Sequence, residues 1–226
     1  MKKMRIALIM QGWQRWVGGT EYIKNIILAL ASLPPEIRST LELCLICSKS
    51  IKQTALDQID SYLDKIYYQE IDLEPPTLKN RLHWKIIKAL SKQQDPRFED
   101  FIRKENIDFI YPYISHDTRH KSYRSAAWIP DFQYKYLTQF FTDEEIQQRD
   151  NSSATIANRA STVVLSSKDA ESDFQKFFPE ASHKTKVLSF KTSPSSIWYE
   201  GNPQHIQVKY YLPKRFFLIS NQFWQH

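Results

Sequence analysis

Glycine is scarce in this chain, and most of its glycines are gathered near the N-terminus. There are 4 glycines in 226 residues, and Gly12, Gly18 and Gly19 fall in a single stretch. They cannot form the pattern GxGxxG, which is typical of dinucleotide-binding turns. The scarcity therefore excludes that common fingerprint and makes the stretch that holds these glycines the informative one.

Cysteine is rarer still, and its placement argues against two kinds of chemistry. The 2 cysteines, Cys44 and Cys47, lie in the apolar run LELCLIC, which is typical of a strand. Residues three apart on a strand point to opposite faces, and no second cysteine pair is present to complete a zinc site. Redox CxxC pairs open helices instead. We therefore expect two inert thiols in the core.

Long hydrophobic runs are also missing. No run approaches the roughly 18 apolar residues that a membrane span needs. The opening MKKMRIALIM has the charge of a signal peptide, but its apolar run ends at Gln11 and no small-residue cleavage site follows. We therefore predict a cytoplasmic protein. Its net charge of +6 and pI near 9.1 favour anionic surfaces, so peripheral attachment at the inner face of the membrane stays open.

The glycine-bearing stretch predicts a strand, a turn and a helix. Residues 5–10 form a short apolar strand, and apolar residues then recur at helical spacing until Pro34 and Pro35. Thr20 is the natural N-cap of this helix. Gly18 and Gly19 would precede that cap, where the missing Cβ lets backbone N–H groups approach an anion. We predict a diphosphate site there, with purely geometric glycines as the alternative.

Beyond this helix the chain keeps alternating between strands and helices. The predicted strands are 41–47, 66–71, 107–114, 125–129, 161–166 and 184–190. The predicted helices lie near 51–65, at 77–92, near 96–104, from about 143 to 159 and at 168–178. Two helix starts are well signalled, by the capping box at Thr142 to Glu145 and by Ser166 with Asp169. The alternation predicts an α/β fold with a doubly wound, mostly parallel, Rossmann-like sheet.

The alternation lapses near the C-terminal end. Residues 191–213 carry Pro194, Gly201, Pro203 and Pro213, which is typical of an interdomain crossing. Residues 215–220, RFFLIS, then predict a further strand. We therefore expect one domain over 1–190, a crossing over 191–213, and the first strand of another domain within 214–226.

Three stretches resemble a known family of enzymes. They are MRIALIMQGWQRWVGGTEYIKNI, AAWIPDFQYKYLTQFFTDEEIQQRD with the following ASTVVLSSKDAESDF, and KRFFLISNQFWQH. Their order and spacing are similar to those of the front half of a GT-B glycosyltransferase, of the large retaining family often labelled glycosyl transferase group 1 or family 4. From the first to the last, these stretches span residues 4–226, which is nearly the whole chain.

The resemblance implies two Rossmann-like domains that face each other across a cleft. The first would hold a glycan or lipid-linked acceptor, and the second a nucleotide-diphosphate sugar as donor, with no separate cofactor and no structural metal. Gly18 and Gly19 match the glycine loop that faces the donor diphosphate. Because nearly all of the second domain would be missing, the resemblance implies a truncated N-terminal fragment that is inactive alone.

Asp131 is the best candidate for an acceptor-side catalytic residue. It ends an apolar strand, where its carboxylate could orient an acceptor hydroxyl or accept its proton. Many relatives carry a histidine directly before the matching acidic residue, whereas this chain has Pro130. A strand-ending Asp is also a common loop-capping residue, which is the alternative.

Two other groups of residues offer chemistry near these loops. His116, Asp117 and His120 could form a metal site or a proton relay, although solvated loop histidines are commoner. The aromatic residues after Asp131 could stack on sugar or lipid, although such clusters more often pack the next helix. These residues are Phe132, Tyr134, Tyr136, Phe140 and Phe141.

A rival interpretation is a non-enzymatic binding module for anionic glycans or nucleic acid. The basic pI favours polyanions in general. The predicted strand at 215–220 argues against a finished module of that kind, and we expect no nucleic-acid partner.

The predicted helix at 77–92 yields a test of membrane attachment. Its apolar stripe holds Leu78, Leu82, Ile86 and Leu90, and its opposite face is basic. If that face serves membranes, the protein should bind anionic vesicles but not neutral ones, and should lose this binding in high salt. Vesicle co-sedimentation measures this, with joint charge reversal at Arg81, Lys85 and Lys88 as the matched variant. Unchanged binding in that variant would assign the helix to a solvated surface instead.

Overall fold

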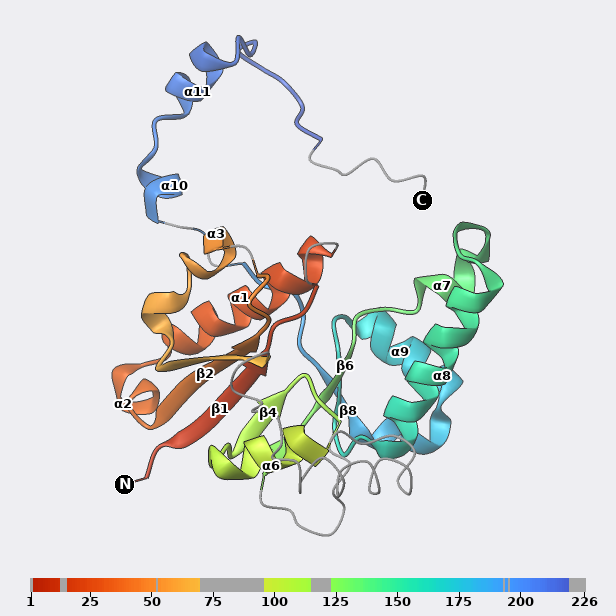
Figure 1. The fold of residues 1–226 in the computed structure, drawn as a ribbon. Helices are drawn as coiled ribbons and strands as arrows, with labels where there is room; N and C mark the ends of the chain where they lie inside the picture. Colours follow the sequence, from red (N-terminus) through yellow and green to blue (C-terminus); the bar gives the residue numbers. More distant parts are fainter. Residues whose placement is uncertain are drawn as a thin grey trace.

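The computed structural model describes residues 2–12, 16–51, 53–69, 96–114, 123–192, 194 and 196–219, and shows a parallel α/β fold (Figure 1). A five-stranded sheet has the order β3-β2-β1-β4-β5, and a three-stranded sheet has the order β6-β7-β8. All strand pairings among the described residues are parallel. The predicted fold class is therefore confirmed.

The strands and helices occupy the following residues. The strands are β1 Met4–Ile9, β2 Leu41–Cys47, β3 Lys65–Tyr68, β4 Phe109–Tyr111, β5 Arg124–Ser125, β6 Ala127–Ile129, β7 Val163–Leu165 and β8 Thr185–Val187. The helices of the first part are α1 Val17–Ala31, α2 Pro35–Arg38, α3 Gln53–Leu56, η1 Asp60–Tyr62 and α6 Pro96–Lys104. The later helices are α7 Gln133–Tyr136, η2 Thr138–Phe140, α8 Asp143–Arg159, α9 Lys168–Phe177, η3 Pro179–Lys184, α10 Ser196–Glu200 and α11 Pro203–Lys209.

Strand β2 divides the core of the first sheet into two faces. Leu43, Leu45 and Cys47 pack with α1 on one face, while Cys44 and Ile46 pack with α6 on the other. The two thiols are buried, and they point to opposite faces as predicted. Burial raises the pKa of the Cys44 thiol to about 12, so this thiol stays protonated at neutral pH.

The two sheets are joined at Ala126, within the segment that the sequence predicts as one strand, 125–129. Ser125 pairs with Ile110 of the first sheet, whereas Ala127 pairs with Val163 of the second. Between them, the Ala126 carbonyl accepts a hydrogen bond from the Tyr113 amide at 2.8 Å. The single predicted strand is therefore wrong in one respect, because its two ends find partners in different sheets.

Of the two helix starts predicted from the sequence, one is confirmed and the other is shifted by one residue. The predicted capping box is present, with Thr142 and Glu145 each accepting from the other's backbone amide. The N-cap of α9, however, is Ser167, whose Oγ accepts from the Ala170 amide at 3.0 Å. The predicted cap Ser166 instead accepts from the Trp128 indole at 2.9 Å. The Ser166 hydroxyl, which the local pattern assigned to the start of α9, is thus bound by the distant Trp128 indole.

Several other elements are shorter than predicted. The single helix expected near 51–65 is divided into α3 and η1. The strand expected at 107–114 is reduced to β4, because Pro112 has no N–H group to continue the ladder. The strands expected at 161–166 and 184–190 are present as β7 and β8, each shorter than predicted. The strand expected at 66–71 is present as β3, which ends at Tyr68, and residues 70–71 lie outside the described residues.

The C-terminal part lies apart from both sheets. Figure 1 shows α10 and α11, in blue, away from the rest, and both fall within the predicted crossing at 191–213. Residues 214–219 form no strand, and Phe217 and Leu218 are exposed. The division into 1–190, 191–213 and 214–226 stays a prediction. The helix predicted at 77–92 lies outside the described residues.

Within the described ranges, none of the helices has the length and apolar character needed to cross a membrane.

The buried ionisable groups predict that the fold loses stability in alkali. Burial raises the pKa of Cys44 from its ordinary 9.0 to about 12 and also raises the pKa of Tyr111. A raised pKa in the folded state gives stability that is complete below the unfolded value and is lost as pH rises through the folded value. The free energy of unfolding should therefore fall as pH rises from about 9 toward about 12.

Urea unfolding at about pH 8 and about pH 10.5 measures this loss. Tyr111→Phe keeps the ring and removes one ionisable hydroxyl, so its loss between the two pH values should be smaller. An unchanged free energy of unfolding across this range would contradict the expected alkaline loss.

Candidate functional site

The candidate site lies at the carboxyl edge of the first sheet, where β1 and β4 are neighbours. The chain runs from β1 to β2 on one side and later returns to place β4 on the other. In open parallel sheets such a reversal leaves a crevice beyond the strand ends, where ligands bind. The segment that follows β1, from Met10 to Gly12, therefore borders the crevice.

Gly12 allows the turn that connects β1 to α1. Its φ is +89°, and its carbonyl accepts a hydrogen bond from the Trp16 amide at 2.7 Å. A Cβ at this position would lie 1.9 Å from the Trp16 carbonyl oxygen, so no other residue fits. The Thr20 hydroxyl donates to the Gln11 carbonyl at 2.9 Å and ties the helix back to the strand end.

The helix start differs from the prediction. Helix α1 begins at Val17, with Trp16 as an N-cap that makes no side-chain capping bond. Thr20 is therefore not the cap, and Gly18 and Gly19 lie in the first turn of the helix instead of before it. The predicted cap is wrong because the helix already begins at Val17, three residues before Thr20, and the Thr20 hydroxyl donates to the Gln11 carbonyl instead.

The Trp16 side chain lies over both glycines. A Cβ on Gly19 would be 2.7 Å from the Trp16 ring, and one on Gly18 would be 3.0 Å from its Nε1. Gly18 is exposed, whereas Gly19 is buried. The missing side chains thus make room for an indole ring, which supports the geometric alternative. The diphosphate role of Gly18, Gly19 and Thr20 stays a prediction.

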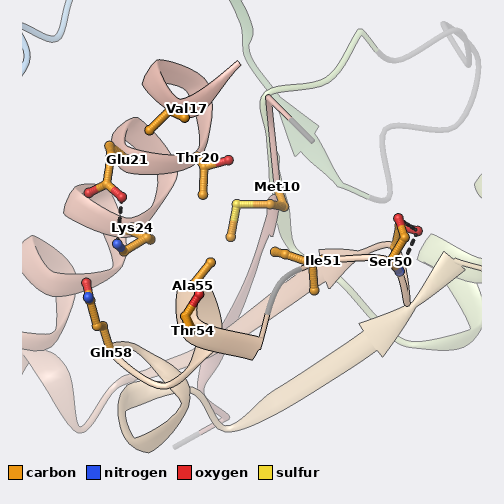
Figure 2. Close-up of a pocket in the computed structure, with 11 residues that line it drawn as sticks. Met10, Val17, Thr20, Glu21, Lys24, Ser50, Ile51, Thr54, Ala55 and Gln58 are labelled. Atoms are coloured by element: carbon orange, nitrogen blue, oxygen red, sulfur yellow. Dashed lines mark hydrogen bonds and ion pairs between the residues drawn. The ribbon is translucent and has the colours of Figure 1, made fainter. Parts of the chain in front are cut away.

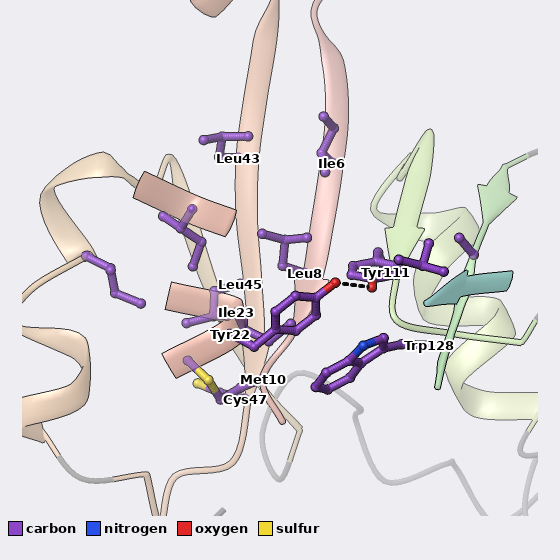
Figure 3. Close-up of a cluster of buried hydrophobic side chains, with 14 of the residues drawn as sticks. Ile6, Leu8, Met10, Tyr22, Ile23, Leu43, Leu45, Cys47, Tyr111 and Trp128 are labelled. Atoms are coloured by element: carbon purple, nitrogen blue, oxygen red, sulfur yellow. Dashed lines mark hydrogen bonds between the residues drawn. The ribbon is translucent and has the colours of Figure 1, made fainter. Parts of the chain in front are cut away.

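An aromatic cluster holds this edge together (Figure 3). Figure 3 shows Trp128 beside Tyr22, and their stacked ring centroids are 4.1 Å apart. Trp128 also stacks on Trp16, with centroids 5.3 Å apart. The hydroxyl groups of Tyr22 and Tyr111 are 2.7 Å apart. Burial raises the pKa of both phenols, so both stay neutral. The sequence analysis missed this cluster, because its members are far apart in the chain and no spacing connects them.

Two cavities open near this edge. One, of about 290 Å³, lies between α1 and the segment after β2 and is bordered by Met10, Lys24 and Ile51 (Figure 2). The other, of about 340 Å³, is bordered by Gln11, Tyr113 and Trp128 and lies beyond the neighbouring ends of β1 and β4. The first cavity combines a buried lysine with apolar and hydroxyl-bearing side chains. These side chains come from α1, from Met10 after β1 and from the segment after β2.

Asp131 follows β6 and is exposed, at the carboxyl edge of the second sheet. Its Oδ1 accepts from the Gln133 amide at 3.1 Å, which is the loop-capping arrangement. This bond uses one carboxylate oxygen at its own loop. Its predicted role toward an acceptor hydroxyl is not tested by this geometry and stays a prediction.

The structure describes the aromatic residues that follow Asp131 but not the predicted histidine group. Phe132 and Tyr134 are buried in the core of the second sheet, as the packing alternative expects, whereas Tyr136 is half exposed. His116, Asp117 and His120 lie outside the described residues. Across the ranges that the structure describes, no group of three His, Cys, Asp or Glu side chains is placed to hold a metal ion.

Comparisons with known proteins give distant similarities. No family model and no curated protein matches the chain. Among solved structures, it is similar to a glycosyltransferase from Rickettsia africae ESF-5, with a TM-score of 0.47 and 10% identity over 95% of this chain and 51% of that one. The chain thus spans about half the length of that structure. It is also similar to the protein MT0777, with a TM-score of 0.28 and 10% identity over 95% of this chain and 99% of that one. Neither similarity assigns an activity.

The turn geometry predicts unequal costs for two alanine substitutions. Gly12→Ala should lower the free energy of unfolding by more than about 2 kcal/mol, because positive φ alone costs about 1–2 kcal/mol and the new Cβ overlaps backbone. Gly18→Ala is the matched control. It should change that free energy by less than about 1 kcal/mol, since its Cβ meets a side chain at the helix start.

Urea unfolding followed by tryptophan fluorescence measures both variants. Equal destabilisation of the two variants would contradict the distinct role of Gly12.

Proposed function

We propose that this chain is part of a retaining glycosyltransferase of the GT-B type, group 1. Such an enzyme would transfer a sugar from a nucleotide-diphosphate sugar. In this proposal the chain supplies the domain that holds a glycan or lipid-linked acceptor. The observation that carries it is the parallel sheet order β3-β2-β1-β4-β5, with a glycine-bearing turn at the reversal point between β1 and β4.

The amino end of α1 supplies the donor side of the proposal. The helix is 15 residues long and begins at this edge of the sheet, so its first backbone N–H groups and its dipole favour an anion. Acidic residues are absent from its first turn, so they do not oppose a diphosphate there. We assign Gly18, Gly19 and Thr20 to this contact, with Trp16 moving off the glycines as the ligand approaches.

Asp131 supplies the acceptor side. Its exposed carboxylate at the end of β6 retains an oxygen to orient an acceptor hydroxyl or to take its proton. The donor sugar itself is the substrate, so no further cofactor is assigned. We place the protein in the cytoplasm, with peripheral membrane contact through 77–92 as part of the same proposal.

The domain alone should bind donors weakly. One helix end offers a few hydrogen bonds of about 1 kcal/mol net each, which barely offset the several kcal/mol lost on immobilising a ligand. Dissociation constants in the millimolar range and no sugar transfer by this chain alone are therefore expected.

Titration with UDP-, GDP- and ADP-sugars, by calorimetry and by thermal melting, tests this assignment. Gly18→Asp places a negative charge at the helix end and should weaken diphosphate binding, whereas Gly18→Asn has nearly the same shape without the charge and should weaken it much less. Absence of binding to all three sugar classes would overturn the assignment of Gly18, Gly19 and Thr20 to the donor diphosphate. Low-micromolar binding, abolished by Gly19→Val, would show that this domain holds the donor by itself.

A further inference from the structure

Lys24 is a buried charge at the wall of the smaller cavity. It lies in the middle of α1 and is only 5% exposed, which is rare for lysine. Its Nζ donates to Glu21 Oε1 at 2.7 Å, and Glu21 is its hydrogen-bond partner in the described part of the chain. An ammonium group has three protons, and a buried one requires acceptors for them. Two donors therefore remain for whatever occupies the cavity.

The rest of the cavity has a polar side and an apolar side. Figure 2 shows Lys24 and Gln58 on one side of it, and Met10 and Ile51 on the other. Thr54 adds a hydroxyl at the rim. The volume of about 290 Å³ equals that of about ten waters, which suits a small ring compound.

We propose that this cavity binds one neutral sugar ring through the Lys24–Glu21 pair. The pair has no net charge, so it favours neither an anion nor a cation. Neighbouring hydroxyls of a sugar can accept from an ammonium and donate to a carboxylate at the same time, which matches the pair. The apolar side formed by Met10 and Ile51 suits the C–H face of the ring.

The position of the cavity identifies the sugar as part of the acceptor, a step that rests on the proposed function. Met10 follows β1 and Ser48 follows β2, so the cavity lies at the carboxyl edge of the first sheet. Asp131, the candidate for the reacting hydroxyl, follows β6 in the second sheet and does not line this cavity. The cavity is therefore a subsite for a sugar unit of the acceptor other than the one that reacts.

The experiment measures binding of D-glucose, D-galactose, D-mannose and myo-inositol to this chain by saturation-transfer NMR and titration. At least one of them should bind, and Lys24→Met should weaken that binding at least about tenfold, since hydrogen bonds to charged groups are lost. Gln58→Leu should also weaken it, whereas Gln53→Leu, the same change on α3 away from the cavity, should not. Ala55→Phe fills the cavity and should abolish binding, and thermal melts confirm that each variant folds.

Three results would overturn the subsite. They are no binding of any of the four compounds, binding that Lys24→Met and Ala55→Phe leave unchanged, and preferential binding of inorganic phosphate or glycine at Lys24. Thr20 lines this cavity and is also assigned to the diphosphate contact, but Gly18 does not line it, so Gly18→Asp tests the donor contact separately. Loss of the subsite with an intact Gly18→Asp effect would refute this inference alone, and the reverse pattern would refute the donor assignment alone.

Discussion

The position of Trp128 is the constraint on which the carboxyl edge depends. It belongs to β6 of the second sheet, yet its ring is buried in the core of the first sheet, stacked between Tyr22 and Trp16. Its indole N–H is bound by Ser166, which fixes the ring from its own sheet. Because Tyr22 and Trp16 flank the start of α1, this stack holds that helix against both sheets.

The turn after β1 places Trp16 where its ring can stack on Trp128. Positive φ at Gly12 brings the Trp16 backbone close to the strand end, and the bare backbone of Gly18 and Gly19 admits the Trp16 ring. The glycines that a sequence pattern assigns to a ligand thus have a structural role in this conformation. A diphosphate at the helix end would compete with the Trp16 ring for the same space, so ligand binding and the aromatic stack should be linked.

Local sequence signals predicted the elements whose ends are set locally. Helix α8 has its predicted bounds because a capping box fixes its start. Strand β2 has its predicted bounds because a run that is apolar at every position except Glu42 needs burial on both faces. The errors fall where distant partners compete for a group. The Thr20 hydroxyl donates to the Gln11 carbonyl, and the Ser166 hydroxyl accepts from the Trp128 indole. Residues 124–125 pair with the first sheet, whereas residues 127–129 pair with the second. No spacing in the sequence encodes these partners, and for the same reason the aromatic cluster and the Lys24 cavity were not predicted.

The central claim is that ligands bind at the carboxyl edge of the sheet, around the amino end of α1. Amide chemical shifts of the isotopically labelled chain, followed during titration with UDP-glucose, test this most directly because they report weak binding residue by residue. The account predicts that the largest shifts fall on Val17 to Thr20 and on the Trp16 indole N–H. Shifts concentrated at the opposite edge, where the Arg5 amide donates to Asp108 at 2.8 Å, would contradict it.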